Sequence, residues 1–455
     1  MSSLILINPW IYDFAAYDLW SKPLGLLHVA SRLRRMGFGV RLIDCLDVHH
    51  PAMTAEKAGR PPLRRAYGTG KYWRKRVPPP APLKGMRRPY SRYGLGRGVL
   101  KAELGRIRKP AAILVTSLMT YWYPGVTAVI RACRKIHPGV PVILGGIYAT
   151  LCTEHAVARS GADRVLTGCA PEPLVAALAD YGILPPGPPQ ENERPVRPAF
   201  DLLHRPDYVC IMTSTGCPYR CRYCASPFLN PRPSRREPAE VVSEIVHWHE
   251  SLGIRDIAFY DDALLVAFDD HLAPILEALA PLNLRFHTPN AVHAGKVTKR
   301  AAGLMRRAGF RTIRIGLETS DFSVHRRIDK KIRAGDFETA VGRLLDAGFP
   351  PGDIGAYILM GLPGQSTASV RESIDFVARA GAVPYLSEYS PIPHTPLWRE
   401  AVRHSRFDLA GEPLFHNNTL IPCWTDSQRE EVPDLKQRAL EVRNRYRLKN
   451  PVSDR

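Results

Sequence analysis

Three cysteines lie close together near the middle of the chain, as Cys217-Pro-Tyr-Arg-Cys221-Arg-Tyr-Cys224. Thiolates at this spacing can ligate three irons of a cubic iron–sulfur cluster, whereas a closed electron-transfer cluster takes four. The chain holds 9 cysteines in 455 residues, so three at such fixed offsets are rare by chance. The motif therefore predicts a [4Fe-4S] cluster with one iron left open to a ligand.

Two other interpretations of the three thiols stay open. A zinc site needs four tetrahedral ligands and usually two cysteine pairs. The fourth candidate near the motif is Cys210, which lies in the apolar run 208–213 and is expected to pack as a small hydrophobe. The thiols could also be inert buried groups, because spacing alone can mislead.

The elements that must position these thiols are indicated by apolar runs in the second half. Six strand-like runs recur there with helical segments between them, which predicts an incomplete (β/α)6 TIM-type barrel. The expected strands are 208–213, 256–261, 285–290, 312–318, 353–360 and 384–390. The thiols fall in the loop after the first strand, where βα barrels carry their chemistry.

The first half also alternates strand and helix patterns, which predicts a doubly wound parallel sheet of the Rossmann or flavodoxin-like kind. The expected strands are 4–8, 40–44, 112–116, 140–145 and 164–166, and the expected helices are 24–37, 124–136 and 153–160. Such sheets bind ligands beyond the carboxyl ends of their strands. This rule selects Ser117, Gly145 and Gly146 as candidate cofactor-binding residues.

The predicted fold class is therefore α/β, with four regions along the chain. The doubly wound domain covers 1–183 and carries a basic insertion at 57–109, and a Pro-rich linker follows at 184–198. The partial barrel covers 199–396, and a small helical cap covers 397–455.

The formal net charge of +20 is concentrated in one segment, since 57–100 holds thirteen Lys or Arg and no Asp or Glu. Together with its tyrosines and Trp73, this composition could bind phosphates and stack bases. No RNA-binding motif accompanies it. An insertion loop, or a lid over an anionic cofactor or substrate, is the preferred interpretation, because charge indicates partners rather than fold.

Hydropathy and cysteine usage bound the class of protein. The apolar runs are far shorter than the ~18 to 20 residues that a membrane helix requires. Residues 1–8 lack the basic region and cleavage site of a signal peptide. The odd, scattered cysteines are typical of a reducing compartment. We therefore expect a globular cytoplasmic protein that does not contact a membrane.

The cysteine triad and the order of the two α/β halves resemble the radical S-adenosylmethionine (SAM) superfamily, in particular its members with an N-terminal cobalamin-binding-like domain. The resemblance covers residues 4–395. It implies that Cys217, Cys221 and Cys224 are the catalytic ligands of a [4Fe-4S] cluster whose open iron chelates SAM. The reduced cluster would then cleave SAM to a 5′-deoxyadenosyl radical.

The same resemblance implies SAM contacts at the ends of strands. Tyr223 matches the aromatic position beside the adenine. Asp261–Asp262 match the motif that engages the methionine ammonium, a cation for which a carboxylate is a suitable acceptor. Glu318 resembles the ribose-binding acid. Gly361-Leu-Pro-Gly364 resembles a backbone turn near the adenine, although an ordinary βα turn is the alternative.

Segments of the first half resemble the cobalamin-type domain, namely Pro23–His28, Leu144–Tyr148 and Gly168–Glu172. The motif Asp-x-His-x-x-Gly, which supplies a lower histidine ligand, is absent after the first strand. A near match at Asp47–Ala52 follows the second strand and ends in alanine. Cobalamin could bind without that histidine, or the domain could have lost it.

The activity implied by the resemblance is cobalamin-dependent methyl transfer or a radical rearrangement. The substrate would be a small molecule or a peptide, and a reducing partner such as flavodoxin or ferredoxin would supply the electron. A tRNA methylthiotransferase is an alternative, but that class has three further N-terminal cysteines, which Cys45 and Cys133 do not reproduce. A non-catalytic nucleic-acid-binding module with a structural metal is another, and it would leave Glu318 without a purpose.

Overall fold

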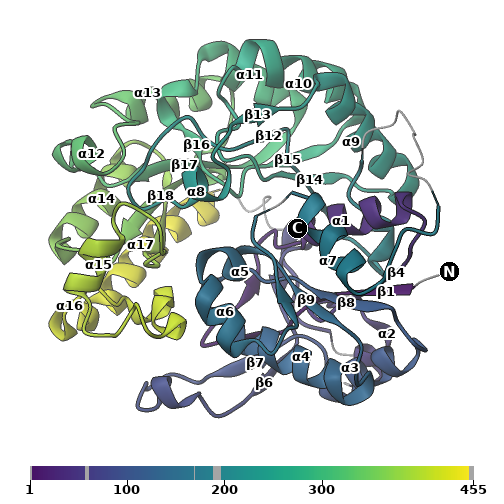
Figure 1. Ribbon diagram of the computed structural model, residues 1–455. Helices are drawn as coiled ribbons and strands as arrows, with labels where there is room; N and C mark the ends of the chain where they lie inside the picture. Colours follow the sequence, from purple (N-terminus) through teal and green to yellow (C-terminus); the bar gives the residue numbers. More distant parts are fainter. Residues whose placement is uncertain (1–2, 57–60, 169, 188–195, 450–455) are drawn as a thin grey trace. The chain divides into compact units, whose positions relative to one another are not determined.

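The computed structural model describes residues 3–56, 61–168, 170–187 and 196–449 (Figure 1). The chain divides into two compact units, the first Met1–Pro206 with Glu412–Leu414 and the second Asp207–Gly411 with Phe415–Arg455. The Pro-rich linker predicted at 184–198 falls in large part outside the described residues. None of the helices within the described ranges has the length and apolar character needed to span a bilayer.

A five-stranded parallel sheet forms the centre of the first unit, in the order β10-β9-β8-β1-β4. The strands are β1 (Ser3–Asn8), β4 (Gly39–Asp44), β8 (Ala112–Val115), β9 (Val142–Leu144) and β10 (Arg164–Val165). The strand order reverses between β1 and β8, which is the topological switch of a doubly wound sheet. The predicted fold of this half is confirmed.

Helices cover both faces of this sheet (Figure 1). On one face α1 (Leu24–Arg35) and α7 (Glu172–Asp180) bury apolar side chains against β1 and β8. On the other lie α3 (Arg97–Gly105) and α4 (Tyr123–Ile136). Shorter helices follow two of the strands: α2 (Pro51–Glu56) follows β4, and α5 (Ile147–Leu151) and α6 (Thr153–Arg159) follow β9.

The basic insertion has regular structure of its own. Its strands β6 (Arg74–Arg76) and β7 (Ser91–Tyr93) form an antiparallel sheet with β2 (Ile11–Asp13). A second, two-stranded sheet joins β5 (Gly70–Lys71) to β3 (Tyr17–Asp18). The buried aromatic side chains of the insertion are Tyr72, Trp73, Tyr90 and Tyr93. These four rings pack in the core, whereas Tyr67 is partly exposed, and a nucleic-acid partner for the insertion stays an alternative.

The second unit contains a seven-stranded parallel sheet. Six strands follow one another in chain order, β11-β14-β15-β17-β18-β19, and β16 also pairs with β17. The strands are β11 (Val209–Ile211), β14 (Asp256–Phe259), β15 (Arg285–His287), β16 (Val292–His293), β17 (Phe310–Glu318), β18 (Ile354–Met360) and β19 (Val383–Glu388). Strands such as β18 are apolar along their length because both faces of a parallel sheet are covered.

The helices between these strands lie along the outside of the sheet (Figure 1). They are α9 (Pro238–Leu252), α10 (Ala273–Leu279), α11 (Lys299–Ala308), α12 (Phe322–Ile328), α13 (Asp336–Asp346) and α14 (Thr367–Arg379). Within the described residues no pairing joins β11 to β19, so the barrel stays open, as predicted. The helices of the C-terminal part are α15 (Trp398–His404), α16 (Asp426–Glu430) and α17 (Val432–Lys449), of which α17 packs on β19 and α14.

Candidate functional site

The three clustered thiols lie in the loop that follows β11 and the short strand β12 (Ser214–Thr215). Cys221 is buried, and Cys217 and Cys224 are partly exposed. Burial raises the pKa of each thiol, and that of Cys221 to about 12. The charge of Cys217 also raises the pKa of Cys224, and Cys224 acts likewise on Cys221, so the three groups are electrostatic neighbours. A metal that binds these sulfurs would displace their protons.

Backbone hydrogen bonds anchor this loop to two distant segments. The amide of Arg222 donates to the carbonyl oxygen of Ile328 at 2.7 Å, at the end of α12. The amide of Leu397 donates to the carbonyl oxygen of Arg222 at 2.9 Å. Since these bonds hold the stretch between the second and third thiols, the spacing of the sulfurs depends on packing as well as on sequence.

The residues around the loop fit a cluster with a ligand beside it. No three His, Cys, Asp or Glu side chains in the described part of the chain converge as ligands of one metal ion. A cluster does not need such convergence, because each thiolate binds its own iron. The ring of His293 stacks on Tyr219, between the first two thiols, with 4.5 Å between centroids. The Nδ1 atom of His293 is buried and has no hydrogen-bond partner among the described atoms, as expected of a group that contacts a bound ligand.

Asp261 supports the strand that leads into the thiol loop. Its carboxylate is buried and accepts four hydrogen bonds, from the amides of Thr213 at 3.0 Å and Ser214 at 2.7 Å and from both hydroxyls at 2.6 Å. Burial raises the pKa of Asp261, and the four bonds oppose that rise. Because these donors come from the protein itself, its contact with the SAM ammonium stays a prediction.

The neighbouring acid, Asp262, acts on two of the thiols through its negative charge. It accepts a hydrogen bond from the Ser226 hydroxyl at 2.6 Å, and the Ser226 amide lies 3.4 Å from the sulfur of Cys224. The charge of Asp262 raises the pKa of Cys217 and Cys224. Of the two acids predicted at the end of β14, Asp262 is therefore the one whose charge acts on the thiols of Cys217 and Cys224.

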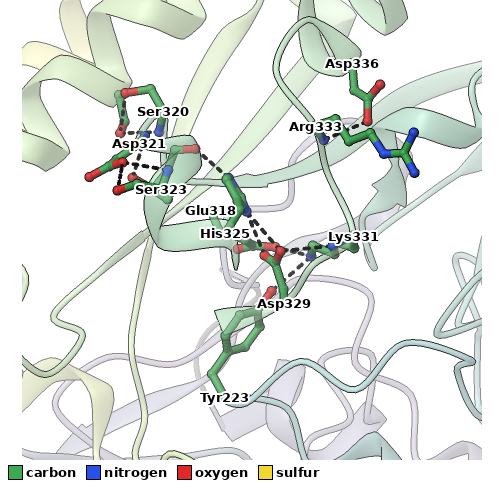
Figure 2. Close-up of polar contacts among 12 residues, drawn as sticks. Tyr223, Glu318, Ser320, Asp321, Ser323, His325, Asp329, Lys331, Arg333 and Asp336 are labelled. Atoms are coloured by element: carbon green, nitrogen blue, oxygen red, sulfur yellow. Dashed lines mark hydrogen bonds and ion pairs between the residues drawn. The ribbon is translucent and has the colours of Figure 1, made fainter. Parts of the chain in front are cut away.

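Glu318 and Tyr223, two predicted SAM contacts, are joined by a lysine that the sequence did not single out. The ammonium of Lys331 lies 2.6 Å from Oε1 of Glu318 and 3.0 Å from the hydroxyl of Tyr223 (Figure 2). Burial lowers the pKa of Lys331, but the charge and hydrogen bond of Glu318, together with the charges of Cys221 and Asp329, outweigh burial and raise it. The ion pair is therefore retained inside the protein.

Further contacts fix the segment that carries Lys331. The two oxygens of Asp329 each lie 3.0 Å from Nδ1 of His325, and Nε2 of His325 lies 2.9 Å from the carbonyl oxygen of Thr319 (Figure 2). The amide of Lys331 donates to Asp329 at 3.2 Å. The end of β17 and the segment 329–331 are thus held together. Glu318 itself has a φ of +66°, which is rare for a residue with a side chain.

The predicted turn after β18 requires glycine for steric reasons. Gly361 and Gly364 have φ values of +101° and +70°. A Cβ at Gly361 would lie 2.8 Å from a methyl carbon of Ile421. The side-chain oxygen of Gln365 accepts hydrogen bonds from the amides of Gly361 at 2.8 Å and Leu362 at 3.2 Å. These contacts account for the turn, and its place beside an adenine stays a prediction.

The candidate residues of the first unit meet at the carboxyl ends of β8 and β9. The Ser117 hydroxyl donates to the carbonyl oxygen of Gly145 at 2.7 Å. Gly146 has a φ of +98°. A Cβ at this position would lie 2.7 Å from the backbone nitrogen of Ser117 and closer still to the backbone carbonyl oxygen of Ser117. The three residues are brought together next to the switch between β1 and β8. Their contact with a cofactor stays a prediction.

Sequence reasoning missed four residues of this site, and the reason is spatial. Lys331, Asp329 and His293 belong to no spacing motif, and Lys331 is 108 positions from Tyr223. Tyr219 lies inside the cysteine motif, but its contact with His293 is visible only in the fold. A polar run between two buried isoleucines, Ile328 and Ile332, is the local signal that could have drawn attention to the lysine.

The fold and the thiol loop define the class of protein. The family model of the radical SAM superfamily matches residues 211–377, which include the three thiols, Asp261, Glu318 and Lys331. This part of the chain matches the radical SAM domain, and the thiol loop lies within the match.

Comparison with individual proteins covers more of the chain. An uncharacterized methyltransferase of Pyrococcus horikoshii is 25% identical over 352 residues, which are 69% of this chain and 74% of that protein. The radical SAM methyltransferase TsrM from Kitasatospora setae, solved with tryptophan and a SAM analogue, matches 97% of this chain and 89% of its own with a TM-score of 0.65 at 15% identity.

Two further solved structures contain cobalamin. TsrM with cobalamin and a [4Fe-4S] cluster bound matches with a TM-score of 0.63 at 18% identity, over 89% of this chain and 78% of that one. The cobalamin-dependent SAM radical enzyme OxsB, solved with aqua-cobalamin and SAM, matches 97% of this chain and 56% of its own, with a TM-score of 0.54 at 13% identity. At these identities the likeness shows the fold, a doubly wound domain followed by an open βα barrel.

Proposed function

We propose that this radical SAM enzyme transfers a methyl group from cobalamin to a small-molecule or peptide substrate. The observation that carries the proposal is the combination of three neighbouring thiols on the first loop of an open barrel with a doubly wound domain ahead of it. The methyltransferase relative and the fold shared with cobalamin-bound TsrM support the same activity.

In this proposal each cofactor has a set of residues that would hold it. Cys217, Cys221 and Cys224 would bind a [4Fe-4S] cluster, which supplies the electron that cleaves SAM. Tyr223 and Glu318 would orient the nucleoside part of SAM. Cobalamin, which supplies the methyl group, would lie at the carboxyl edge of the first sheet, where doubly wound sheets bind ligands.

The partners follow from the same chemistry. The enzyme requires a one-electron donor of low potential, and flavodoxin or ferredoxin is the class that we propose. All cysteines among the described residues are free thiols, which supports a reducing, cytoplasmic environment. The proposed substrate class does not include RNA, and burial of four of the five aromatic rings of the basic insertion supports this choice.

Anaerobic reconstitution of the full chain tests the proposal. We expect about four irons per chain, loss of that iron in Cys224→Ala, and retention in Cys133→Ala, whose thiol is buried in α4 of the first unit. Added SAM and reductant should yield 5′-deoxyadenosine, and added cobalamin should give a spectrum of bound corrinoid.

The outcomes separate the parts of the proposal. A loaded cluster with no SAM cleavage or binding would refute the radical SAM assignment of the site. Normal SAM cleavage with no corrinoid binding would refute only the methyl transfer from cobalamin and would leave the radical SAM assignment in place. About eight irons per chain would instead indicate the second cluster of a methylthiotransferase.

A further inference from the structure

We infer that Lys331 is a positioning residue whose fixed positive charge orients Glu318 and raises the reduction potential of the cluster at Cys217, Cys221 and Cys224. The inference rests on the proposed function, because it requires the cluster. It extends that function to a residue that takes no part in binding iron.

The first support is the geometry of the lysine. Its ammonium is within hydrogen-bond distance of both Glu318 and Tyr223, and its side chain is 10% exposed. The ammonium also lies over the Tyr223 ring, 5.7 Å from its centroid. Tyr223 stands between the second and third thiols in sequence, so the lysine is packed against the loop that carries the ligands.

The second support is that the segment carrying the charge of Lys331 is held in place by hydrogen bonds. The amide of Lys331 is bonded to Asp329, which is held in turn by His325 (Figure 2). Solvent screens such a buried charge weakly, so its field acts on neighbouring groups at close range. A flexible surface lysine would have no comparable effect.

The third support is the reach of that field. The lysine contacts the side chain of Tyr223, which lies two positions after Cys221 and one position before Cys224 in the thiol loop. A buried positive charge packed against the ligand loop favours the more negative, reduced form of the cluster. Net charge and hydrogen bonding near the sulfurs are among the factors that set cluster potentials. Glu318 offsets part of the effect, because it pairs with the lysine.

The same ion pair determines the orientation of the Glu318 carboxylate. Its backbone is in the left-handed region, and the strand register shifts between Gly316 and Glu318. The lysine contacts Oε1 of this carboxylate. Without the lysine, Glu318 would be a buried unpaired carboxylate, which is costly and would turn toward other donors. SAM affinity should therefore depend on Lys331.

The test is a redox titration of the reconstituted full-length protein, followed by electron paramagnetic resonance. In Lys331→Met we expect the one-electron reduction of the cluster to become at least tenfold less favourable, a shift of about 59 mV to lower potential. We also expect SAM to bind about tenfold more weakly, measured by calorimetry on the oxidised protein, where no turnover occurs.

Matched variants separate charge from folding. Lys331→Arg keeps the charge and should retain most of the potential while it weakens the Tyr223 contact. Lys330→Asn removes an exposed neighbouring charge at a position with φ +55°, which asparagine tolerates, and should leave the potential unchanged. If Lys331→Met loads poorly, the double variant with Glu318→Gln removes both members of the pair and should show a smaller shift to lower potential, because Lys331 contacts the thiol loop through Tyr223.

Two results would overturn the inference. One is an unchanged potential in cluster-loaded Lys331→Met or in the double variant. The other is an equal shift in Lys330→Asn, which would indicate a general effect of surface charge. Wild-type protein that holds no cluster would instead overturn the proposed function together with this inference.

Discussion

At the scale of single residues, the site is organised by buried charges that are paired within the protein. Glu318 is paired with Lys331, and the carboxylate of Asp261 is surrounded by donors from Thr213 and Ser214. Removal of one partner from such a pair leaves the other charge buried and uncompensated, which costs more than loss of the contact itself. Single substitutions here should therefore have large effects.

The first prediction concerns Asp261. In Asp261→Asn one carboxylate oxygen becomes an NH2 group that faces donors, so at least one of the four hydrogen bonds is lost. We expect a loss of stability on the order of 2–3 kcal/mol and reduced iron retention after reconstitution. Thermal melting and iron analysis measure both. Asp262→Asn, with its one bond to Ser226, should melt close to wild type. Equal melting temperatures for both variants would contradict this role of Asp261.

The second prediction is a pH dependence at Asp44, at the end of β4. Burial, followed by the charge of Asp47, raises the pKa of Asp44 to about 6 from 3.8. The folded protein then holds this proton more tightly than the unfolded chain, so stability falls as pH rises from about 4 to 6 and levels off above. Asp44→Asn should remove this loss and raise stability at pH 8 on the order of 1–3 kcal/mol.

Melting curves at pH 4.5 and pH 8 check the Asp44 prediction. The variant keeps an oxygen acceptor for Asn8 at 2.7 Å and for the Leu46 amide at 2.9 Å, so hydrogen bonding is conserved. A stabilisation of the same size at both pH values would show that ionisation is not its cause.

At the scale of elements, strand ends and the turns after them decide the geometry of both units. Parallel strands bring the residues at their carboxyl ends to one edge. Ser117 after β8 meets Gly145 and Gly146 after β9 for this reason. In the second unit, the end of β14 supports the loop after β11 in the same manner. The turn backbones are tight, so they tolerate few side chains.

The third prediction compares the two glycines after β9. Gly146→Ala should destabilise the first unit by more than about 2 kcal/mol, because the added carbon meets the Ser117 backbone at a positive φ. At Gly145 the nearest heavy atom to an added Cβ is 3.9 Å away, so Gly145→Ala should be tolerated. Thermal melting distinguishes the variants, and cobalamin titration should show weaker binding in Gly146→Ala only. Similar melting of the two would contradict the steric argument.

Strand and helix positions could be predicted well because periodicity is a local property. The runs expected at 285–290 and 353–360 correspond to β15 and β18, and the helix expected at 124–136 is α4. The structured part of the basic insertion was not anticipated. Its strand β7 pairs with β2, far away in sequence, and no local pattern reports such a pairing.

At the scale of the whole molecule, part of the net charge of +20 is exposed on the edge strand β6. All three residues of that strand, Arg74, Lys75 and Arg76, are exposed. Charge of this kind binds polyanions without selecting a sequence, through counterion release. It governs solubility and non-specific association rather than the reaction.

The fourth prediction is that glutamine at these three positions weakens polyanion binding without affecting the reaction. The slope of log binding constant against log salt for duplex DNA should fall by up to about one per residue removed. SAM cleavage should be unchanged, because β6 belongs to the first unit and the residues proposed to bind SAM belong to the second. An unaltered slope would show that these three residues do not contribute to polyanion binding. A loss of SAM cleavage would assign them a role in the reaction.

The amino-acid sequence alone predicted the fold class of both units and singled out the three thiols that we propose as cluster ligands. Both depend on short-range information, the period of apolar residues and eight consecutive positions from Cys217 to Cys224. Only the tertiary structure decided which charges surround those thiols. Lys331 meets Tyr223 across 108 positions, and Asp261 meets Thr213 across 48. Contacts of that range are selected by the packing of strand ends and loops, and no local pattern in the chain encodes them.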